Sequence, residues 1–139
     1  MGEVRASVVL ENAADRELAR RGALAPSEVR QVTAILLVDT GAVLVLLPQD
    51  LVEALGLEPP GRAIVAPAHE QRVELGRAGP LRLTVAGRTT TADCLVGPPG
   101  CEPLLGQVVL ESLDLVVDPL REQVTPRPES PFLPTLKLK

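Results

Sequence analysis

The residues best placed to do chemistry are Asp39, Thr40 and Gly41, which form a short polar turn. Residues 34–38 (AILLV) precede it and residues 43–47 (VLVLL) follow it, a pattern that predicts two buried strands joined at Asp39. A carboxylate between buried strands costs free energy unless it is paired or used. Asp39 is therefore a candidate catalytic acid. The alternative is a structural aspartate that accepts hydrogen bonds from its own turn.

The other ionisable residues have plainer interpretations. Four further acids are predicted to be surface charges: Asp93, Glu102, Asp114 and Asp118. His69 is expected to be a solvated loop residue, with a pH-sensing contact as the alternative. Cys94 and Cys101 are either reduced thiols or a disulfide across the short loop between them. Two cysteines with a distant histidine do not make a zinc site, so we expect no metal and no cofactor.

Length and composition favour one soluble domain. The 139 residues are enough for a substantial core. With Phe132 as the only aromatic residue, that core must be aliphatic. The chain has no basic cluster with aromatic platforms and no apolar stretch of bilayer length, so neither nucleic acid nor membrane is an expected partner. The first residues lack a secretory signal pattern, which favours a cytoplasmic location.

The order of apolar runs and turn signals predicts an all-β fold with one or two short helices. Strand patterns occur at residues 4–10, 32–38, 42–47, 63–65, 72–75, 81–85, 88–96, 114–118 and 121–125. Helix signals follow Asn12 and occur at residues 48–56 and 107–113. Gly79 and Pro80 are expected to break the chain. Residues 1–126 then form the domain, and residues 127–139 an extended proline-rich tail.

An internal repeat appears when the sequence is shifted by 58 positions. Residues 37–57 align without a gap on residues 95–115, with eight identities over 21 positions. Both copies have the order strand, turn, strand, helix, which predicts a pseudo-two-fold pair of units with a shared core. In the second copy Gly97 takes the place of Asp39. The chain therefore carries the scaffold twice and the carboxylate once.

These motifs resemble the retropepsin-like aspartic proteases, the single-domain, homodimeric kind. The resemblance covers roughly residues 2–126. It rests on the apolar strand before Asp39-Thr40-Gly41-Ala42, the apolar strand after it, and the step Leu104-Leu105-Gly106 before a helix. Two positions differ from the usual family pattern: the segment 67–71 contains no glycine, and Gln107 stands where retroviral enzymes usually carry arginine.

The resemblance implies a closed all-β barrel and an endopeptidase whose catalytic Asp39 meets Asp39 of a second subunit. Such a pair shares one proton and titrates as a unit. Thr40 would link the two turns across the dimer, and Gly41 would allow the tight turn. Substrate would contact Ala42 and a β-hairpin flap over residues 65–73, in particular Ala66, Pro67, Ala68 and His69.

Two other functions remain open from the sequence. The same fold could serve as a weakly active or inactive dimeric module that binds peptides or mediates assembly. A ligand-binding barrel is a third possibility, although the aromatic-lined pocket expected of one is absent from the pattern.

Overall fold

The computed structural model describes residues 3–65 and 73–136. Strands dominate, and their bounds are β1 Arg5–Asn12, β2 Gln31–Val38, β3 Val45–Pro48, β4 Glu58–Val65, β5 Val73–Val85, β6 Arg88–Gly97, β7 Leu104–Leu105, β8 Leu115–Asp118 and β9 Gln123–Pro126. The described part has three short α-helices, one at each helix signal of the sequence, where the fold prediction had allowed for one or two: α1 Ala13–Arg20, α2 Gln49–Ala54 and α3 Gln107–Leu113. A 3₁₀ turn, η1, spans Pro26–Glu28.

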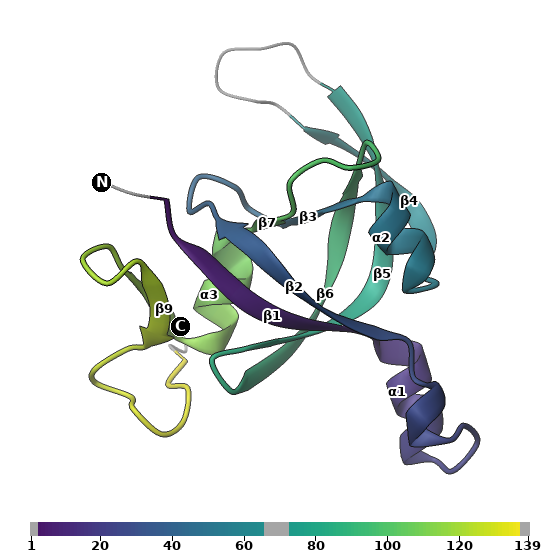
Figure 1. Cartoon of the computed structure of the whole chain (residues 1–139), viewed down its shortest axis with the longest axis horizontal. Helices are drawn as coiled ribbons and strands as arrows, with labels where there is room; N and C mark the ends of the chain where they lie inside the picture. Colours follow the sequence, from purple (N-terminus) through teal and green to yellow (C-terminus); the bar gives the residue numbers. More distant parts are fainter. Residues whose placement is uncertain (1–2, 66–72, 137–139) are drawn as a thin grey trace.

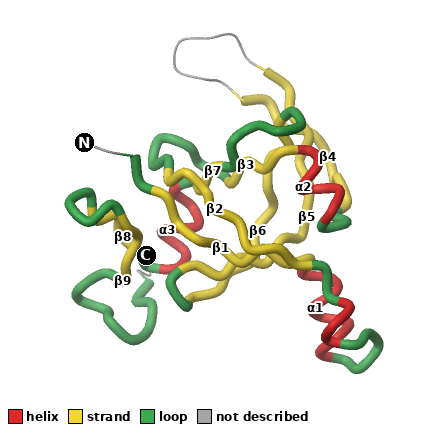
Figure 2. Tube along the Cα trace, in the orientation of Figure 1, coloured by secondary structure: helices red, strands yellow, loops and turns green. Residues whose placement is uncertain are grey.

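Six strands close into a barrel of mixed strand direction (Figures 1 and 2). The order is β1-β2-β7-β3-β6-β5, and β1 pairs with β5 to complete the ring. The β2–β7 and β3–β6 ladders are parallel, and the other pairings are antiparallel. β4 extends the sheet beyond β5, while β8 and β9 form a separate hairpin. The predicted closed, mostly β fold is confirmed at this level.

Aliphatic side chains fill the barrel, as the lack of aromatic residues requires. Alternate residues of β1 point inward, so Ala6, Val8 and Leu10 are buried. α3 adds Val109, Leu110 and Leu113 to the same cluster. Together these residues make one contiguous core that fixes the ends of the strands bearing the candidate site.

The predicted break at Gly79-Pro80 is wrong, because β5 continues through it. The strand runs from Val73 to Val85, and its pairing with β6 shifts register between Ala78 and Leu81. Extra residues on one strand of a ladder form a β-bulge, which bends the strand without ending it. One long strand therefore connects the arm beside β4 with the wall of the barrel.

Backbone pairing follows the 58-residue repeat. The β2–β7 ladder pairs Leu37 with Leu104 and Val38 with Leu105. The β3–β6 ladder pairs Leu95 with Leu46 and Val96 with Leu47. A shift of 58 positions maps both pairs of the β2–β7 ladder onto these two of the four pairs of the β3–β6 ladder. The single β3–β7 pair, Leu46 with Leu104, maps onto itself because its members are 58 positions apart. The repeat in sequence is thus also a repeat in strand pairing.

Candidate functional site

Asp39 directly follows β2 and is half-buried. Its backbone N–H donates to the carbonyl oxygen of Leu105 at 3.0 Å, and the N–H of Ala42 donates to the Asp39 carbonyl oxygen at 3.0 Å. The N–H of Gly41 donates to Oδ1 of Asp39, also at 3.0 Å. The carboxylate is therefore oriented by its own turn, and the turn is fixed to β7.

The loop after Asp39 is also attached to the start of α3. The first N–H groups of a helix have no acceptor inside the helix. Here the N–H of Gln107 donates to the Ala42 carbonyl oxygen at 2.8 Å, and that of Val108 to the Val43 carbonyl oxygen at 3.1 Å. The second copy of the repeat thus supports the acidic turn of the first copy with backbone contacts.

Gly106 makes this close approach possible. A Cβ at this position would lie 2.4 Å from the Leu44 carbonyl oxygen and 2.8 Å from the Val43 carbonyl oxygen. Both atoms are backbone, so neither can rotate out of the way. The sequence signal for this contact was the step Leu104-Leu105-Gly106, but the contact itself was not foreseen.

Asp39 has no basic partner among the described residues. The other acids with well-covered side chains do have one: Glu11 pairs with Arg16 and Arg82, Asp15 with Arg30, and Asp114 with Arg127. The Gly41 hydrogen bond fits both a catalytic and a structural aspartate. A half-buried carboxylate without a cation favours the catalytic interpretation, because the charge is left available to a bound molecule.

The residues around Asp39 face solvent. Thr40 and Gly41 are exposed, and in the described part of the chain the Thr40 hydroxyl has no hydrogen-bond partner. Val43 is 66% exposed although it lies in an apolar run. The turn is therefore presented outward by a rigid support.

In the second copy a thiol fills the space of the missing carboxylate. A Cβ on Gly97 would lie 2.6 Å from Sγ of Cys101 and 3.3 Å from Cδ1 of Leu46. The loop that carries Cys101 is held by the Gly100 N–H, which donates to Oδ1 of Asp50 at 3.1 Å. A larger residue in place of Gly97 would therefore have to displace the Cys101 thiol.

Both cysteines are free thiols, which settles the alternative left open by the sequence. Burial raises the pKa of Cys94 to about 12, with a further contribution from the charge of Asp93. Burial also raises the pKa of Cys101, to which the nearby Asp50 adds. Neither environment favours a thiolate, so neither cysteine has the setting of an activated nucleophile.

The remaining predicted substrate-binding residues are only partly covered by the structure. Ala42 is half-buried in the Asp39 loop, whereas Ala66, Pro67, Ala68 and His69 lie outside the described residues. The described ends of β4 and β5 that lead to them lie at the same end of the barrel as the β2–β3 and β6–β7 loops (Figure 1). The turn at Asp39, the related turn at Gly97 and the ends of β4 and β5 therefore lie at one end of the barrel.

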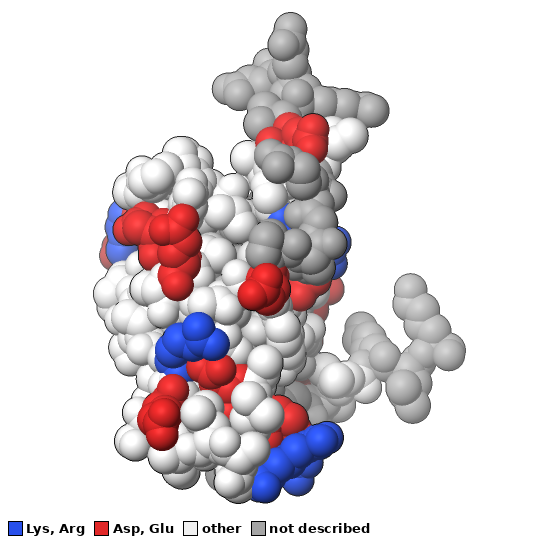
Figure 3. Space-filling view, turned by 90° about the vertical axis from the view of Figure 1, so that its right-hand side faces the viewer, with Lys and Arg blue, Asp and Glu red and all other residues white. Residues whose placement is uncertain are grey.

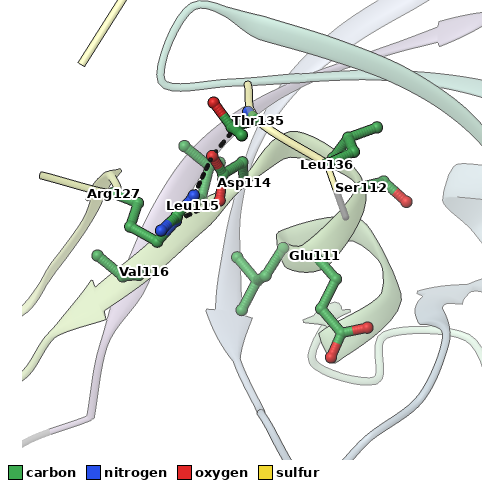
Figure 4. Close-up of a pocket in the computed structure, with 9 residues that line it drawn as sticks. Glu111, Ser112, Asp114, Leu115, Val116, Arg127, Thr135 and Leu136 are labelled. Carbon is green, nitrogen blue, oxygen red and sulfur yellow. Dashed lines mark hydrogen bonds and ion pairs between the residues drawn. The ribbon is translucent and has the colours of Figure 1, made fainter. Parts of the chain in front are cut away.

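Asp114 is a structural hub, so its prediction as a surface charge is wrong. Its side chain is only 10% exposed and pairs with Arg127, the two closest atoms being 2.7 Å apart (Figure 4). It also accepts hydrogen bonds from the Ser130 hydroxyl and from the Thr135 N–H. These contacts fold the predicted tail back against β8 and α3. Asp93, Glu102 and Asp118 do lie at the surface, each in an ion pair with arginine.

Two hollows lie apart from Asp39. One, of about 560 Å³, is lined by α3, β8 and the tail and includes Asp114 and Arg127 (Figure 4). The other, of about 520 Å³, lies between α2, β5 and β6 and includes Glu53 and Gly97. Asp39 lines neither of them.

The described surface offers few other functional features. Acidic and basic groups are interspersed on the face in Figure 3, without a continuous patch of Lys and Arg. Within residues 3–65 and 73–136, no group of three or more His, Cys, Asp and Glu side chains is arranged to hold a metal ion. No helix in those ranges has the length and apolarity to cross a bilayer.

No family model matches the chain, and no curated protein matches it.

Proposed function

We propose that the protein is a retropepsin-like aspartic endopeptidase that acts as a homodimer. The observation that carries the proposal is Asp39, a solvent-facing carboxylate without a cation, in an Asp-Thr-Gly turn held rigidly by β7 and α3. A reactive group held by backbone hydrogen bonds on a rigid scaffold is what catalysis requires.

The repeat in strand pairing supports the family assignment and the dimer. Exchange of the β2–β7 and β3–β6 ladders under the 58-residue shift is the relation expected of a pseudo-two-fold fold. Only one of the two related turns has an acid, and the other has Gly97 next to the Cys101 thiol. The second carboxylate of the pair therefore comes from another copy of the chain.

The chemistry follows from two carboxylates that share one proton across a two-fold axis. The ionised Asp39 takes a proton from a bound water, whose oxygen attacks the scissile carbonyl carbon. The protonated Asp39 of the partner subunit donates a hydrogen bond to the carbonyl oxygen. The proton is then delivered to the leaving nitrogen as the C–N bond breaks. No metal or cofactor enters this scheme.

The neighbouring residues have supporting roles in this proposal. The unpartnered Thr40 hydroxyl links the two turns across the dimer. The substrate peptide binds in an extended form beside Ala42 and beneath the flap residues Ala66, Pro67, Ala68 and His69, pairing with exposed backbone edges.

The experiment compares wild type with Asp39→Asn on a mixed peptide library between pH 3 and 7. We expect cleavage by wild type and a loss of at least about 10²–10⁴-fold in the variant, the range for loss of a general acid or base. Glu28→Gln, a change at an exposed acid in η1, is the control and should cleave normally.

Equal inactivity of wild type and Asp39→Asn, with no binding of a pepstatin-like transition-state mimic, would contradict the protease proposal. Peptide binding without cleavage would then support the second candidate, a dimeric peptide-binding module. That candidate is favoured by the same solvent-facing turn and requires no proton transfer at Asp39.

A further inference from the structure

We infer that Asp114, at the far end of α3 from the acidic turn, is a positioning residue for Asp39. The C-terminal segment 127–135 binds Asp114 and fixes the end of α3, and the start of α3 fixes the loop after Asp39. This inference rests on the proposed function, and it makes the candidate site depend on a segment that follows β9.

The contacts of the C-terminal segment converge on Asp114. The Arg127 N–H donates to the Asp114 carbonyl oxygen at 3.2 Å, and Nε of Arg127 donates to Oδ1 at 2.7 Å. The Thr135 N–H donates to Oδ2 at 2.8 Å, and the Ser130 hydroxyl donates to the same oxygen. The residue at the end of α3 is therefore also the residue to which this segment is attached.

The backbone of Asp114 gives the end of α3 two possible states. Its φ of 54° and ψ of 49° lie in the left-handed region, and its N–H closes the last turn of the helix on the Glu111 carbonyl oxygen at 3.1 Å. This conformation costs a typical non-glycine residue roughly 1–2 kcal/mol, although aspartate tolerates it better than most. Binding of the C-terminal segment offsets that cost, so the helix end and the segment are stabilised together.

Arg88 joins the same elements to the wall of the barrel. It is the buried first residue of β6, and it donates hydrogen bonds to the carbonyl oxygens of Leu113, Asp114 and Ser130. The last carbonyl groups of a helix have no donor within the helix, and a cation is favourable at that end. One guanidinium group therefore holds the end of α3 and the C-terminal segment in a fixed relation.

α3 connects this attachment to Asp39. The helix spans Gln107–Leu113, a length of about 10 Å at 1.5 Å per residue. At its other end the N–H groups of Gln107 and Val108 donate to the carbonyl oxygens of Ala42 and Val43. A helix this short is not stable by itself in water, so it depends on its buried face and on the contacts at both ends. Loss of the contacts at Asp114 therefore loosens the contacts with the Asp39 loop.

The experiment compares Asp114→Asn with Asp15→Asn, a closely matched control. The two side chains are 10% and 9% exposed, and each binds one arginine side chain and one backbone N–H. Asp15 lies on α1, which packs against β1 and β5 and is distant from α3 (Figure 1). Asparagine also tolerates the left-handed conformation, so the change at Asp114 acts through the lost charge and acceptor.

The first measurement is hydrogen exchange of single amides, which reports local opening. In Asp114→Asn the N–H groups of Gln107 and Val108 should exchange at least about 10-fold faster relative to the amides of the β1–β5 ladder, as expected for loss of a charged hydrogen bond. In Asp15→Asn this ratio should equal that of wild type. Ser130→Ala, which removes one donor to Asp114, serves if Asp114→Asn fails to fold and should change the ratio in the same direction.

The second measurement is peptide cleavage at a pH where all the variants are folded. Asp114→Asn should lower kcat by about 10- to 100-fold with KM close to the wild-type value, because a small misplacement of Asp39 affects the chemical step more than binding. Asp15→Asn should keep both constants. A general loss of stability would not separate the two variants in this way.

The outcomes distinguish this inference from the proposed function. Faster exchange at Gln107 and Val108 in Asp114→Asn alone, in a protein whose wild type cleaves nothing, would support the link through α3 and contradict the protease. A wild type that cleaves peptides, with Asp114→Asn and Asp15→Asn alike in exchange and in kcat, would overturn the link and leave the protease proposal intact. Selectively faster exchange with an unchanged kcat would overturn the positioning role of Asp114.

Discussion

At the scale of single residues, the site depends on two glycines as much as on its acid. Gly41 supplies the N–H that orients Asp39, and a Cβ on it would lie 3.2 Å from Oδ1 of that carboxylate. Gly106 supplies space, since a Cβ there would meet the backbone of Leu44. The orientation of the Asp39 carboxylate and the position of its loop therefore depend on residues that have no reactive groups themselves.

Gly106→Ala is predicted to damage both stability and activity. The added methyl group must push the 42–44 loop away from α3, which strains the hydrogen bonds of Gln107 and Val108. Overpacking against a rigid backbone typically costs about 1–3 kcal/mol. Urea unfolding measures this cost, and a peptide-cleavage assay measures the effect on Asp39.

The matched control is Gly76→Ala in β5, where an added Cβ would make only an ordinary contact, 3.5 Å from Cβ of Val96. We expect its unfolding free energy to stay close to that of wild type. Equal stability of the two alanine variants would contradict the role given to Gly106.

At the scale of elements, the excursion between β1 and β2 is attached to the barrel through Asn12. Its Oδ1 accepts a hydrogen bond from the Asp15 N–H at 3.0 Å, which caps α1. Its Nδ2 donates to the carbonyl oxygens of Leu55 and Gly56, at 2.9 and 3.2 Å. One buried side chain thus begins α1 and holds the end of α2.

Asn12→Ala is predicted to destabilise the protein by roughly 2–3 kcal/mol, the sum of a lost cap and of buried carbonyl groups left without donors. Asn12→Asp keeps the oxygen that caps α1 but loses both hydrogen bonds that Nδ2 donates. Its loss of stability should therefore come mainly from the unpaired carbonyl oxygens of Leu55 and Gly56. Denaturant unfolding of the three proteins tests this division. An alanine variant as stable as wild type would show that α1 is not coupled to α2.

Elements with strong local signals could be predicted from the sequence. Asn12 before α1, Gly56 after α2 and the helix at residues 107–113 all matched because a cap or a periodic apolar face is encoded within a few neighbouring residues. The start of β3 did not match. This strand begins at Val45 and not at Ala42. The N–H groups at the start of α3 donate to the carbonyl oxygens of Ala42 and Val43, so these oxygens are not available for strand pairing.

The candidate site could be located from the sequence, but its supports could not. The triplet at Asp39 is local, whereas the N–H groups that support it come from Gln107 and Val108, more than 60 positions away. The contacts of Arg88 were not predicted either: it donates to the carbonyl oxygens of Leu113 and Ser130, which lie 25 and 42 positions away. Such contacts depend on topology, which no local pattern contains.

At the scale of the whole molecule, the partly buried Asp114–Arg127 ion pair makes the free energy of unfolding depend on pH in the acid range. Hydrogen bonds from Arg127, Ser130 and Thr135 hold the pKa of Asp114 well below its usual value. A carboxyl group with a lowered pKa in the folded state stabilises it above the unfolded pKa, near 3.8. That contribution is lost as the pH falls toward the folded value.

Asp114→Asn is therefore predicted to be less stable than wild type at neutral pH. The difference in the free energy of unfolding between the two proteins should narrow steadily below about pH 4. Urea midpoints measured from pH 7 to pH 2 test the sign and the range. Glu28→Gln, at an exposed acid without an ion pair in the described structure, is the control and should follow wild type at every pH. A gap that widens in acid would contradict the role of the Asp114 carboxylate.

The position of β7 has a consequence for how the protein is made. This two-residue strand lies between β2 and β3, although it follows them by more than 50 positions in the chain. A nascent chain that ends before Leu105 lacks the strand that lies between β2 and β3. It also lacks the Leu105 carbonyl oxygen that accepts the hydrogen bond from the Asp39 N–H. The barrel can therefore close, and the turn at Asp39 can be anchored, only after Leu104 and Leu105 have been synthesised. Because pairing of distant segments is slow, we expect closure of the barrel around β7 to be a late step in folding.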